Sequence, residues 1–258
     1  MAIRSSLSGG NFVAHHVANH IANHALGTLS EQAFAQLVPH LHKHVVAKGT
    51  VLWSGANPHG SIFFPLSGVV SIVRTDTEGR GVEVGFAGRE SAVGFSAQEL
   101  TRGIVQVGGV FVQVVADRFW AVASERAELR TMAASCQDWM LVQARVLAAC
   151  NAVHDLQARL CRWLLQISDR TASEIPSTQE EIAQLLGVQR TTTTLVAHRL
   201  QDEGIIRNRR GRIEVRDRAR LLELTCGCYH DLAALRPLSE PSASVAVHYH
   251  PTPLPAQA

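Results

Sequence analysis

Between Leu41 and Trp120 the chain alternates short apolar runs with glycine-containing turns. The runs are HVVAKG, TVLWSG, SIFFPLSG, VVSIVRTDTEG, VEVGFAG, IVQVGG and VFVQVVA, all rich in the β-branched and aromatic residues that favour strands. Short strands separated by turn signals at roughly 8–12-residue spacing are typical of all-β rolls and barrels. With helical patterns on both sides, the sequence predicts an α+β fold with an N-terminal, jelly-roll-like β-roll over residues 29–123.

After Ser124 a helical period replaces the strand pattern. The positions of a stripe that is apolar except for Gln143 then recur at alternating spacings of three and four, the a/d pattern of a coiled coil. They are Leu129, Met132, Cys136, Trp139, Gln143, Val146 and Cys150. We predict one long dimerisation helix over residues 124–152, in which about 26 helical residues would extend roughly 39 Å. Its seam is predicted to pair with a second chain, with Gln143 fixing the register. Alternatively, this stripe packs on the chain's own β-roll.

The two ends of the chain carry weaker patterns. Residues 1–28 are predicted to be an extension that is partly helical or disordered, with helical spacing over 16–38 and Ser30 as an N-cap. Residues 226–258 are predicted to be a largely disordered tail, because proline is frequent and periodicity is absent. Histidines at 16, 20 and 24 and at 40, 42 and 44 have spacings that can bind metal, but no carboxylate or cysteine accompanies them, so no metal site is predicted.

Charge and cysteine content narrow the class of protein. The formal net charge is only +2, so any nucleic-acid binding must rest on a local concentration of charge. Five cysteines and no apolar leader or membrane-length apolar run indicate a cytoplasmic chain with free thiols and no membrane partner. Cys226 and Cys228 lie close together, and we expect buried structural thiols there, with no assigned role.

A second helical region follows the long helix. Residues Leu156–Ser168 form one amphipathic segment, and Ser177 with Glu180 three residues later forms a capping box that starts the next helix. Gly187 and Val188 make a turn, and Arg190–Asp202 is predicted as another helix. Two short helices joined by a glycine turn are a helix-turn-helix, whose second helix meets base edges in the DNA major groove.

The start of that second helix is polar and is followed by a basic hairpin. Four threonines follow Arg190, although β-branched residues are poor helix formers. Residues 189–212 contain six arginines and two acidic residues, a local charge of +4, which suits phosphate binding. The predicted DNA-binding residues are Thr178, Gln189, Arg190, Thr191, Thr192, Thr194, Leu195, His198, Arg207, Arg209, Arg210 and Arg212, whereas Thr193 faces inward.

These stretches resemble the Crp/Fnr superfamily of bacterial regulators over roughly residues 30–230. The resemblance rests on SIFFPLSGVVSIV, RLCRWLLQISDR and TQEEIAQLLGVQRTTTTLVAHRLQDEGIIRNRRGRIEV. It implies a cyclic-nucleotide-binding-like roll and, over 153–225, a Crp-type winged helix-turn-helix that binds double-stranded DNA. It further implies a homodimer, a small-molecule effector whose state is relayed through the long helix, and RNA polymerase as a further partner. By resemblance, the base-reading residues are Arg190, Thr191 and either Thr194 or Leu195. Thr191 stands where family members often carry a glutamate, so the DNA sequence of the operator cannot be inferred from the family.

The effector is not identified by the sequence. Cyclic-nucleotide-binding members hold phosphate with a glycine–glutamate cassette and a downstream arginine. The corresponding residues here are Glu90, Gly94 and Arg102, but Phe95 stands where the glutamate would follow Gly94. Cyclic nucleotide is therefore not favoured, the cofactor is left unknown, and none is required.

Two other classes of function fit the sequence less well. An effector-binding module that acts on a protein partner without binding DNA would leave the arginine-rich hairpin without a role. An enzyme is not predicted, because no nucleophile–base pair, Walker loop or zinc-protease motif is present. The sequence therefore favours a DNA-binding transcription regulator.

Overall fold

The computed structural model describes residues 23–55, 60–96, 100–171 and 173–236. The predictions for residues 1–22, including His16 and His20, and for the tail beyond 236 lie outside the described residues. The description begins with two short helices and a 3-10 turn, α2 (His24–Gly27), α3 (Glu31–Leu37) and η1 (Val38–His40). Ser30 caps α3 by accepting a hydrogen bond from the Ala33 amide, as the sequence predicts.

All seven apolar runs form strands. They are β1 (His42–Val46), β2 (Val51–Ser54), β3 (Ser61–Pro65), β4 (Val69–Thr75), β5 (Gly81–Ala87), β6 (Thr101–Val107) and β7 (Gly109–Val115). The strands form two antiparallel sheets, in the orders β1-β7-β3 and β2-β6-β4-β5. Apolar side chains such as Phe63, Val70 and Phe111 fill the space between them, which confirms the predicted β-roll.

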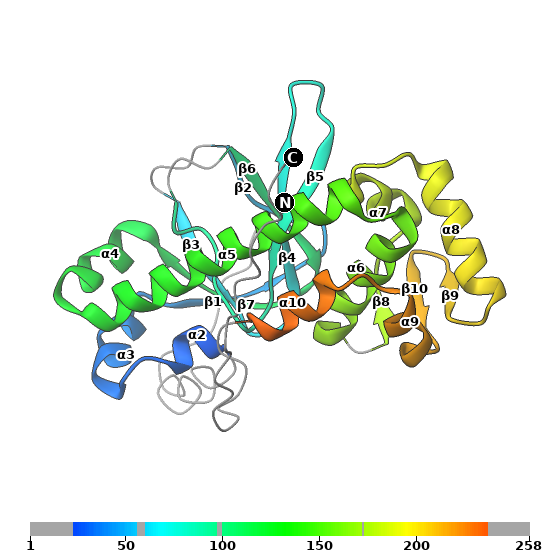
Figure 1. Ribbon diagram of the computed structural model, residues 1–258. Helices are drawn as coiled ribbons and strands as arrows, with labels where there is room; N and C mark the ends of the chain where they lie inside the picture. The colour runs from blue at the N-terminus through cyan, green and yellow to red at the C-terminus, as the bar shows by residue number, and fades with distance from the viewer. Residues whose placement is uncertain (1–22, 56–59, 97–99, 172, 237–258) are drawn as a thin grey trace, which may run out of the picture.

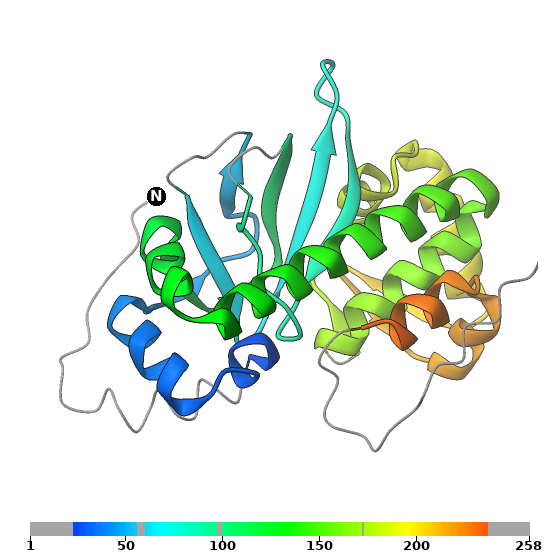
Figure 2. The same ribbon diagram turned by 60° about the vertical axis from the view of Figure 1, so that its left-hand side comes forward.

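Two helices follow the roll where one was predicted. α4 (Ala116–Glu125) ends at Arg126, whose extended backbone (φ −124°, ψ 106°) separates it from α5 (Ala127–Val153). The Arg130 side chain binds the carbonyl oxygens of Ala123 and Ser124 at the end of α4, so the break leaves these acceptors satisfied. The long helix thus begins three residues later than predicted, and it crosses the molecule beside the roll (Figures 1 and 2).

The predicted seam of α5 faces the chain itself. Leu129, Met132, Cys136, Trp139 and Gln143 are all at most 4% exposed in the single chain, and Val146 is half-buried. The first three pack with α2, α3 and the roll, while Trp139 packs with Leu232 of the last helix. The seam therefore does not present a free surface to a second chain, and the alternative of packing within the chain is correct.

Gln143 shows why a polar residue stands in this stripe. Its side-chain oxygen accepts a hydrogen bond from the Phe86 amide (3.1 Å), and its nitrogen donates to the Phe86 carbonyl (3.0 Å). β5 is an edge strand, so these backbone groups have no neighbouring strand to pair with. Gln143 supplies the missing partners, which replaces the predicted role of setting a coiled-coil register.

The C-terminal part contains five helices and three strands among the described residues. They are α6 (Leu156–Thr171), β8 (Glu174–Ile175), α7 (Gln179–Leu186), α8 (Arg190–Asp202), β9 (Ile206–Arg209), β10 (Arg212–Val215), α9 (Arg218–Leu224) and α10 (Cys228–Ala234). The strands form a sheet in the order β8-β10-β9. α10 lies where the sequence predicts a disordered tail; Tyr229 and Leu232 are buried, which gives this short helix an apolar face.

One apolar cluster joins the roll to the C-terminal part. It contains Val69, Val73 and Phe86 of the roll together with Trp163 and Leu164 of α6. The same cluster continues into α7, α8 and the β9–β10 hairpin. The helix-turn-helix is therefore packed against the roll as well as connected to it by α5.

Candidate nucleic-acid interface

The first helix of the helix-turn-helix, α7, begins at a capping box one residue later than predicted. The Thr178 hydroxyl accepts a hydrogen bond from the Glu181 amide (3.2 Å), and a Glu181 carboxylate oxygen accepts one from the Thr178 amide (2.8 Å). Ser177, the predicted cap, is buried and accepts a hydrogen bond from the Gln106 side chain (2.7 Å). Ser177 with Glu180 and Thr178 with Glu181 both fit the capping-box pattern. The hydrogen bond between Gln106 of the roll and Ser177 leaves Thr178 as the cap.

Gly187 forms the turn after α7 in the left-handed conformation, with φ 66° and ψ 37°. Its amide donates to carbonyl oxygens at the end of α7, which closes the helix. A β-carbon at this position would lie 2.7 Å from the Val82 side chain of β5. Glycine is therefore required both by the backbone angle and by the close approach of the roll.

The second helix, α8, spans Arg190–Asp202 as predicted. Its inner face buries Val196, Ala197 and Leu200 against the core. Thr193 is also fully buried, and its hydroxyl lies 3.5 Å from the Gln189 carbonyl, which confirms that this threonine faces inward. The inner face thus fixes which side of α8 remains open.

The outer face of α8 carries most of the predicted DNA-binding residues of this helix. Gln189, Arg190, Thr191, Thr192, Leu195 and His198 are all exposed, and Leu195 is 56% exposed although it is apolar. Arg190 lies 3.3 Å from Glu180, with 69% and 47% of the two side chains exposed. Such exposed pairs contribute little stability, so Arg190 can leave Glu180 at small cost.

Thr194 differs from its neighbours. Its hydroxyl donates a hydrogen bond to the Gln179 side chain of α7 (2.8 Å), and the residue is half-buried. This contact holds the first turn of α8 against the first turn of α7. Of the two residues offered for the third base-reading position, Leu195 is the more exposed.

The β9–β10 hairpin forms the wing. Arg209 pairs with Arg212 and Arg207 with Glu214, so these four side chains share one face of the hairpin. The opposite face buries Ile206, Ile213 and Val215 against the core, as alternation along a strand requires. The turn contains Gly211 at φ 75° and an exposed Arg210. Thr178, outside the hairpin, is exposed at the start of α7.

The wing arginines fall into two groups. Arg209 lies 3.4 Å from Glu214, and Arg212 lies 3.2 Å from Glu174 of β8. Glu214 also binds Arg216 (2.6 Å), and the hydrogen bond from Arg216 is the main reason that the pKa of this carboxyl is lowered. Within the described part of the chain, Arg207 and Arg210 form no ion pair, so they are the wing cations most available to an anion.

Two of the three residues predicted for an effector pocket, Glu90 and Gly94, make close contacts within the chain itself. Glu90 is buried, and one of its oxygens accepts hydrogen bonds from Arg170 Nε (2.9 Å) and Nη2 (2.6 Å) of α6. Burial raises the pKa of Glu90, but the charge and hydrogen bonds of Arg170 outweigh it, so the net pKa is lowered. Gly94 (φ 93°) lies so close to Ser61 that a β-carbon would meet its carbonyl oxygen at 2.3 Å. Arg102 lies on β6, opposite Val73 and Ser54.

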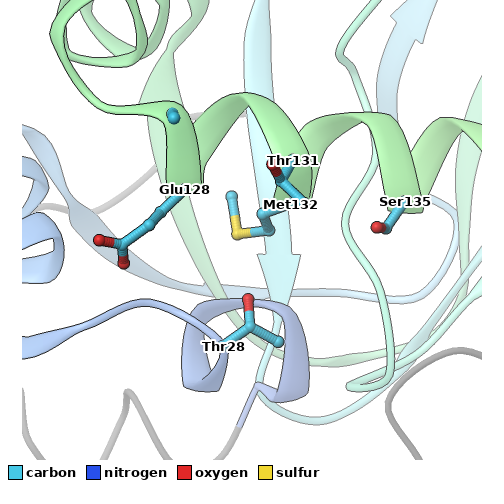
Figure 3. A pocket seen from close by; sticks show the side chains of 6 residues that line it. Thr28, Glu128, Thr131, Met132 and Ser135 are labelled. Carbon is cyan, nitrogen blue, oxygen red and sulfur yellow. The ribbon is translucent and has the colours of Figure 1, made fainter.

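A hollow of about 310 Å³ lies elsewhere, between α2 and the start of α5. Figure 3 shows Met132 extending from α5 toward Thr28, the residue that ends α2. The six lining residues are Thr28, Ala127, Glu128, Thr131, Met132 and Ser135, none of them basic. Glu128 is already bound by the amide and hydroxyl of Ser30. This lining offers no cation for a phosphate group.

A cluster of four potential ligands was missed by the sequence analysis. Cys150, His154, Cys226 and Cys228 place one ligand atom each within 4.8 Å of one another. The sulfur of Cys226 lies 3.6 Å from that of Cys150. The hydrogen bond between these two thiols is the main reason that the pKa of Cys150 is lowered to about 4. The same bond raises the pKa of Cys226. The short spacings Cys150-x3-His154 and Cys226-x-Cys228 were the available signal, but the two pairs lie far apart in the chain.

Cys161 and Cys136 lie apart from this cluster, in separate apolar clusters of the core. Burial raises the pKa of the Cys161 thiol to about 12 and also raises that of Cys136. Both thiols are free and buried, and so are those of Cys226 and Cys228, for which buried thiols are expected from the sequence. Among the described helices, none combines the length and the apolar character needed to cross a membrane.

Comparisons with known proteins agree with this geometry. Residues 158–224 match the family model of the Crp-like helix-turn-helix domain. No curated protein sequence matches the chain.

Several solved structures share its fold. A protein from Eubacterium rectale assigned to the Crp/Fnr family of transcriptional regulators is 20% identical, with a TM-score of 0.63 over 77% of this chain and 95% of that one. FixK2 from Bradyrhizobium japonicum is 15% identical, with a TM-score of 0.62 over 72% and 98%. A Crp/Fnr-family regulator from Thermus thermophilus is 22% identical, with a TM-score of 0.60 over 71% and 97%. The chain therefore contains a Crp-like helix-turn-helix domain over residues 158–224 and has the fold of solved Crp/Fnr-family regulators.

Proposed function

We propose that α8 enters the major groove and reads base edges with Arg190, Thr191 and Leu195, while the wing contacts flanking phosphates through Arg207 and Arg210. The supporting observation is that the polar outer face of α8 and the unpaired wing cations are exposed at one end of the molecule (Figure 1). Arginine can bind guanine through two hydrogen bonds, and a threonine or leucine side chain can contact the methyl group of thymine.

The wing and α8 are held as one unit, which suits simultaneous contacts to groove and backbone. The Asn208 amide of β9 donates to the Gln201 side chain of α8 (2.9 Å). The apolar faces of both elements also share one core. Phosphate contacts from the wing would therefore fix the position in which α8 meets the bases.

We further propose that the protein acts as a homodimer through the outer face of α5. The inner face is covered by the chain itself, whereas Ala134, Leu141 and Ala148 are exposed at helical spacing, with Leu141 47% exposed. Small residues around one leucine allow two helices to approach closely. A two-fold dimer would place its two α8 helices on half-sites about 34–36 Å apart, one turn of DNA.

The contacts between roll and helix-turn-helix support a relay of effector state. Lys48 of the roll forms an ion pair with Glu181 of α7 (2.7 Å), and Gln106 binds Ser177 beside the same helix. Movement in the roll would therefore reach α7 directly as well as through α5. A small-molecule effector and RNA polymerase are the further partners of this function, which would be carried out in the cytoplasm.

The test is selection of genomic fragments by the full-length protein, followed by measurement of binding to the enriched duplex and to a shuffled duplex of equal length. Preference for the enriched duplex is expected. Failure to retain any fragment would favour the alternative of a module that regulates a protein partner without binding DNA. Equal affinity for both duplexes would refute base reading by α8.

A further inference from the structure

The four clustered ligands join two segments that are distant in the sequence. Cys150 lies in the last turn of α5, and His154 is the residue that ends this helix. Cys226 precedes α10, and Cys228 is its first residue. The cluster therefore sits where the long helix gives way to the DNA-binding part, with two ligands from each side of that junction.

The spacing of the ligand atoms matches a tetrahedral ion. Zinc–sulfur and zinc–nitrogen bonds of about 2.3 and 2.0–2.1 Å require sulfur–sulfur and sulfur–nitrogen separations of roughly 3.8 and 3.6 Å at tetrahedral angles. The Cys150 and Cys226 sulfurs lie 3.6 Å apart, and the Cys228 sulfur lies 3.7 Å from His154 Nδ1. All four ligand atoms lie within 4.8 Å of one another, so small side-chain adjustments would bring them to the distances of a tetrahedral coordination shell.

The charges around the cluster provide a second, independent indication. Arg159 and Arg162 are 9% and 2% exposed, and both interact electrostatically with the thiols. Neither forms an ion pair among the residues that the structure describes, although Arg162 also interacts electrostatically with the buried Glu83. The Nε atom of each arginine has no hydrogen-bond partner there. Buried arginines are normally paired with negative charge. Three thiolates, one neutral histidine and a divalent ion would carry a net charge of −1 beside them.

We propose that Cys150, His154, Cys226 and Cys228 bind one thiophilic divalent cation, for which zinc is the best fit, and that this ion fastens the end of α5 to α10. Binding would replace the remaining thiol protons with metal–sulfur bonds and release those protons to water. Three sulfur ligands and one imidazole are a common structural zinc set. A polynuclear iron–sulfur cluster fits less well, because its ligands bind different iron atoms and must stand farther apart.

The proposal does not depend on DNA binding, and its first test uses the metal alone. Full-length protein is reduced, freed of metal with a chelator and titrated with Co²⁺. We expect the absorption bands of tetrahedral, thiolate-bound cobalt to saturate at one equivalent per chain and to disappear when Zn²⁺ is added. Absence of these bands at saturating Co²⁺ would overturn the proposal.

Variants assign the ligands. Cys228→Ser and His154→Ala should each weaken Zn²⁺ binding by at least about 100-fold, above the roughly 10–100-fold typical of residues that only support a ligand. Cys136→Ala and Cys161→Ala are matched controls, because both thiols are buried outside the cluster, and they should keep wild-type affinity. Unchanged affinity in Cys228→Ser and His154→Ala would place the metal elsewhere and overturn the assignment.

A measurement on the unaltered chain covers the case in which a variant does not fold. The alkylation rate of each cysteine is followed by peptide mass, with and without one equivalent of Zn²⁺ under reductant. Zinc should slow the alkylation of Cys150, Cys226 and Cys228 and leave Cys136 and Cys161 unchanged. Equal slowing of all five, or a Cys150–Cys226 disulfide that persists in reductant and excludes zinc, would contradict the proposal.

Discussion

Helices α5 and α8 each carry a residue pattern that the sequence predicts to face another molecule. In the structure the pattern of α8 is exposed, whereas that of α5 is buried. On α8 the polar residues from Gln189 to Thr192 are exposed. On α5 the heptad stripe through Trp139 is buried within the chain. A polar stripe must remain accessible unless partners are built for it, whereas an apolar stripe is satisfied by any apolar surface. Periodicity therefore identifies the covered face of a helix but not what covers it.

The largest effect should come from the buried stripe of α5. Replacing Trp139 with alanine removes a side chain that packs with Leu147 and Leu232, so the free energy of unfolding should fall by about 3–5 kcal/mol. Urea denaturation measures the loss. The exposed Gln137→Ala on the same helix should change stability by less than about 0.5 kcal/mol. If Trp139→Ala lowered the free energy of unfolding by less than about 1 kcal/mol and also dissociated dimers, the result would support a seam between two chains.

The next effect concerns the ion pair that joins the helix after α5 to the roll. Glu90→Gln leaves the buried Arg170 without its counter-ion, and the free energy of unfolding should fall by about 3 kcal/mol. The exposed pair of α8 is the comparison: Glu180→Gln should change stability by less than about 1 kcal/mol. Equal losses would mean that burial does not distinguish the two pairs.

The same glutamate predicts a pH dependence. Its folded-state pKa is lowered, so its contribution is fully present above the unfolded value of about 4.3 and is lost as pH falls through the folded value. The stability difference between wild type and Glu90→Gln should therefore shrink as the solution is acidified below about pH 4.3. A difference that grows with acidification would contradict this sign.

On α8 the effect should appear in DNA binding. Arg190→Ala should weaken binding to the selected duplex by about 1–3 kcal/mol and to random DNA by much less. Arg190→Lys keeps the charge but loses the planar fork, so it should recover binding to random DNA and not to the selected site. Fluorescence anisotropy at fixed salt measures all four affinities. Full recovery by lysine would show that Arg190 acts as a charge only.

The wing should give a smaller effect that depends on salt. Arg210→Ala removes one phosphate contact, so the slope of log affinity against log salt should become shallower by about 0.9. Arg80, an exposed arginine of the loop between β4 and β5, is the control, and Arg80→Ala should leave the slope unchanged. An unchanged slope for Arg210→Ala would place the wing away from the DNA backbone.

The smallest effect on stability should come from the outer face of α5. Leu141→Glu should change the free energy of unfolding of the single chain by less than about 0.5 kcal/mol because the side chain is exposed. It should nevertheless convert dimers into monomers, since a charge would be buried between the two helices. Sedimentation velocity reports the mass. Persistent dimers would move the interface away from this face.

Local signals predicted most of the elements. The seven strands and both ends of α8 follow from β-branched runs and helical spacing in the printed sequence. The start of α7 moved by one residue because Gln106, 71 positions away, binds Ser177. The break at Arg126 and helix α10 were not predicted. Arg126 donates a hydrogen bond to Gln36, 90 positions earlier, and Leu232 of α10 packs with Trp139 of α5, so both involve segments distant in the chain.

The candidate sites also differ in whether their residues are close together or far apart in the sequence. The residues of the proposed DNA-binding surface all fall between Thr178 and Arg212, so they could be predicted together. Glu90 pairs with Arg170, 80 positions later, a partner that no local spacing in the sequence indicates. The ligand cluster combines positions near 150 with positions near 226, and no local spacing connects them.

Strand β8 is only two residues long, yet it pairs with β10 and so attaches the wing to the segment that leaves α6. Helix α6, α8 and the hairpin also share one apolar core, so the sheet and the core hold these three elements as one unit. A change in the orientation of α6 would therefore carry α8 and the hairpin together, and the proposed contacts to groove and backbone would form or break as a set.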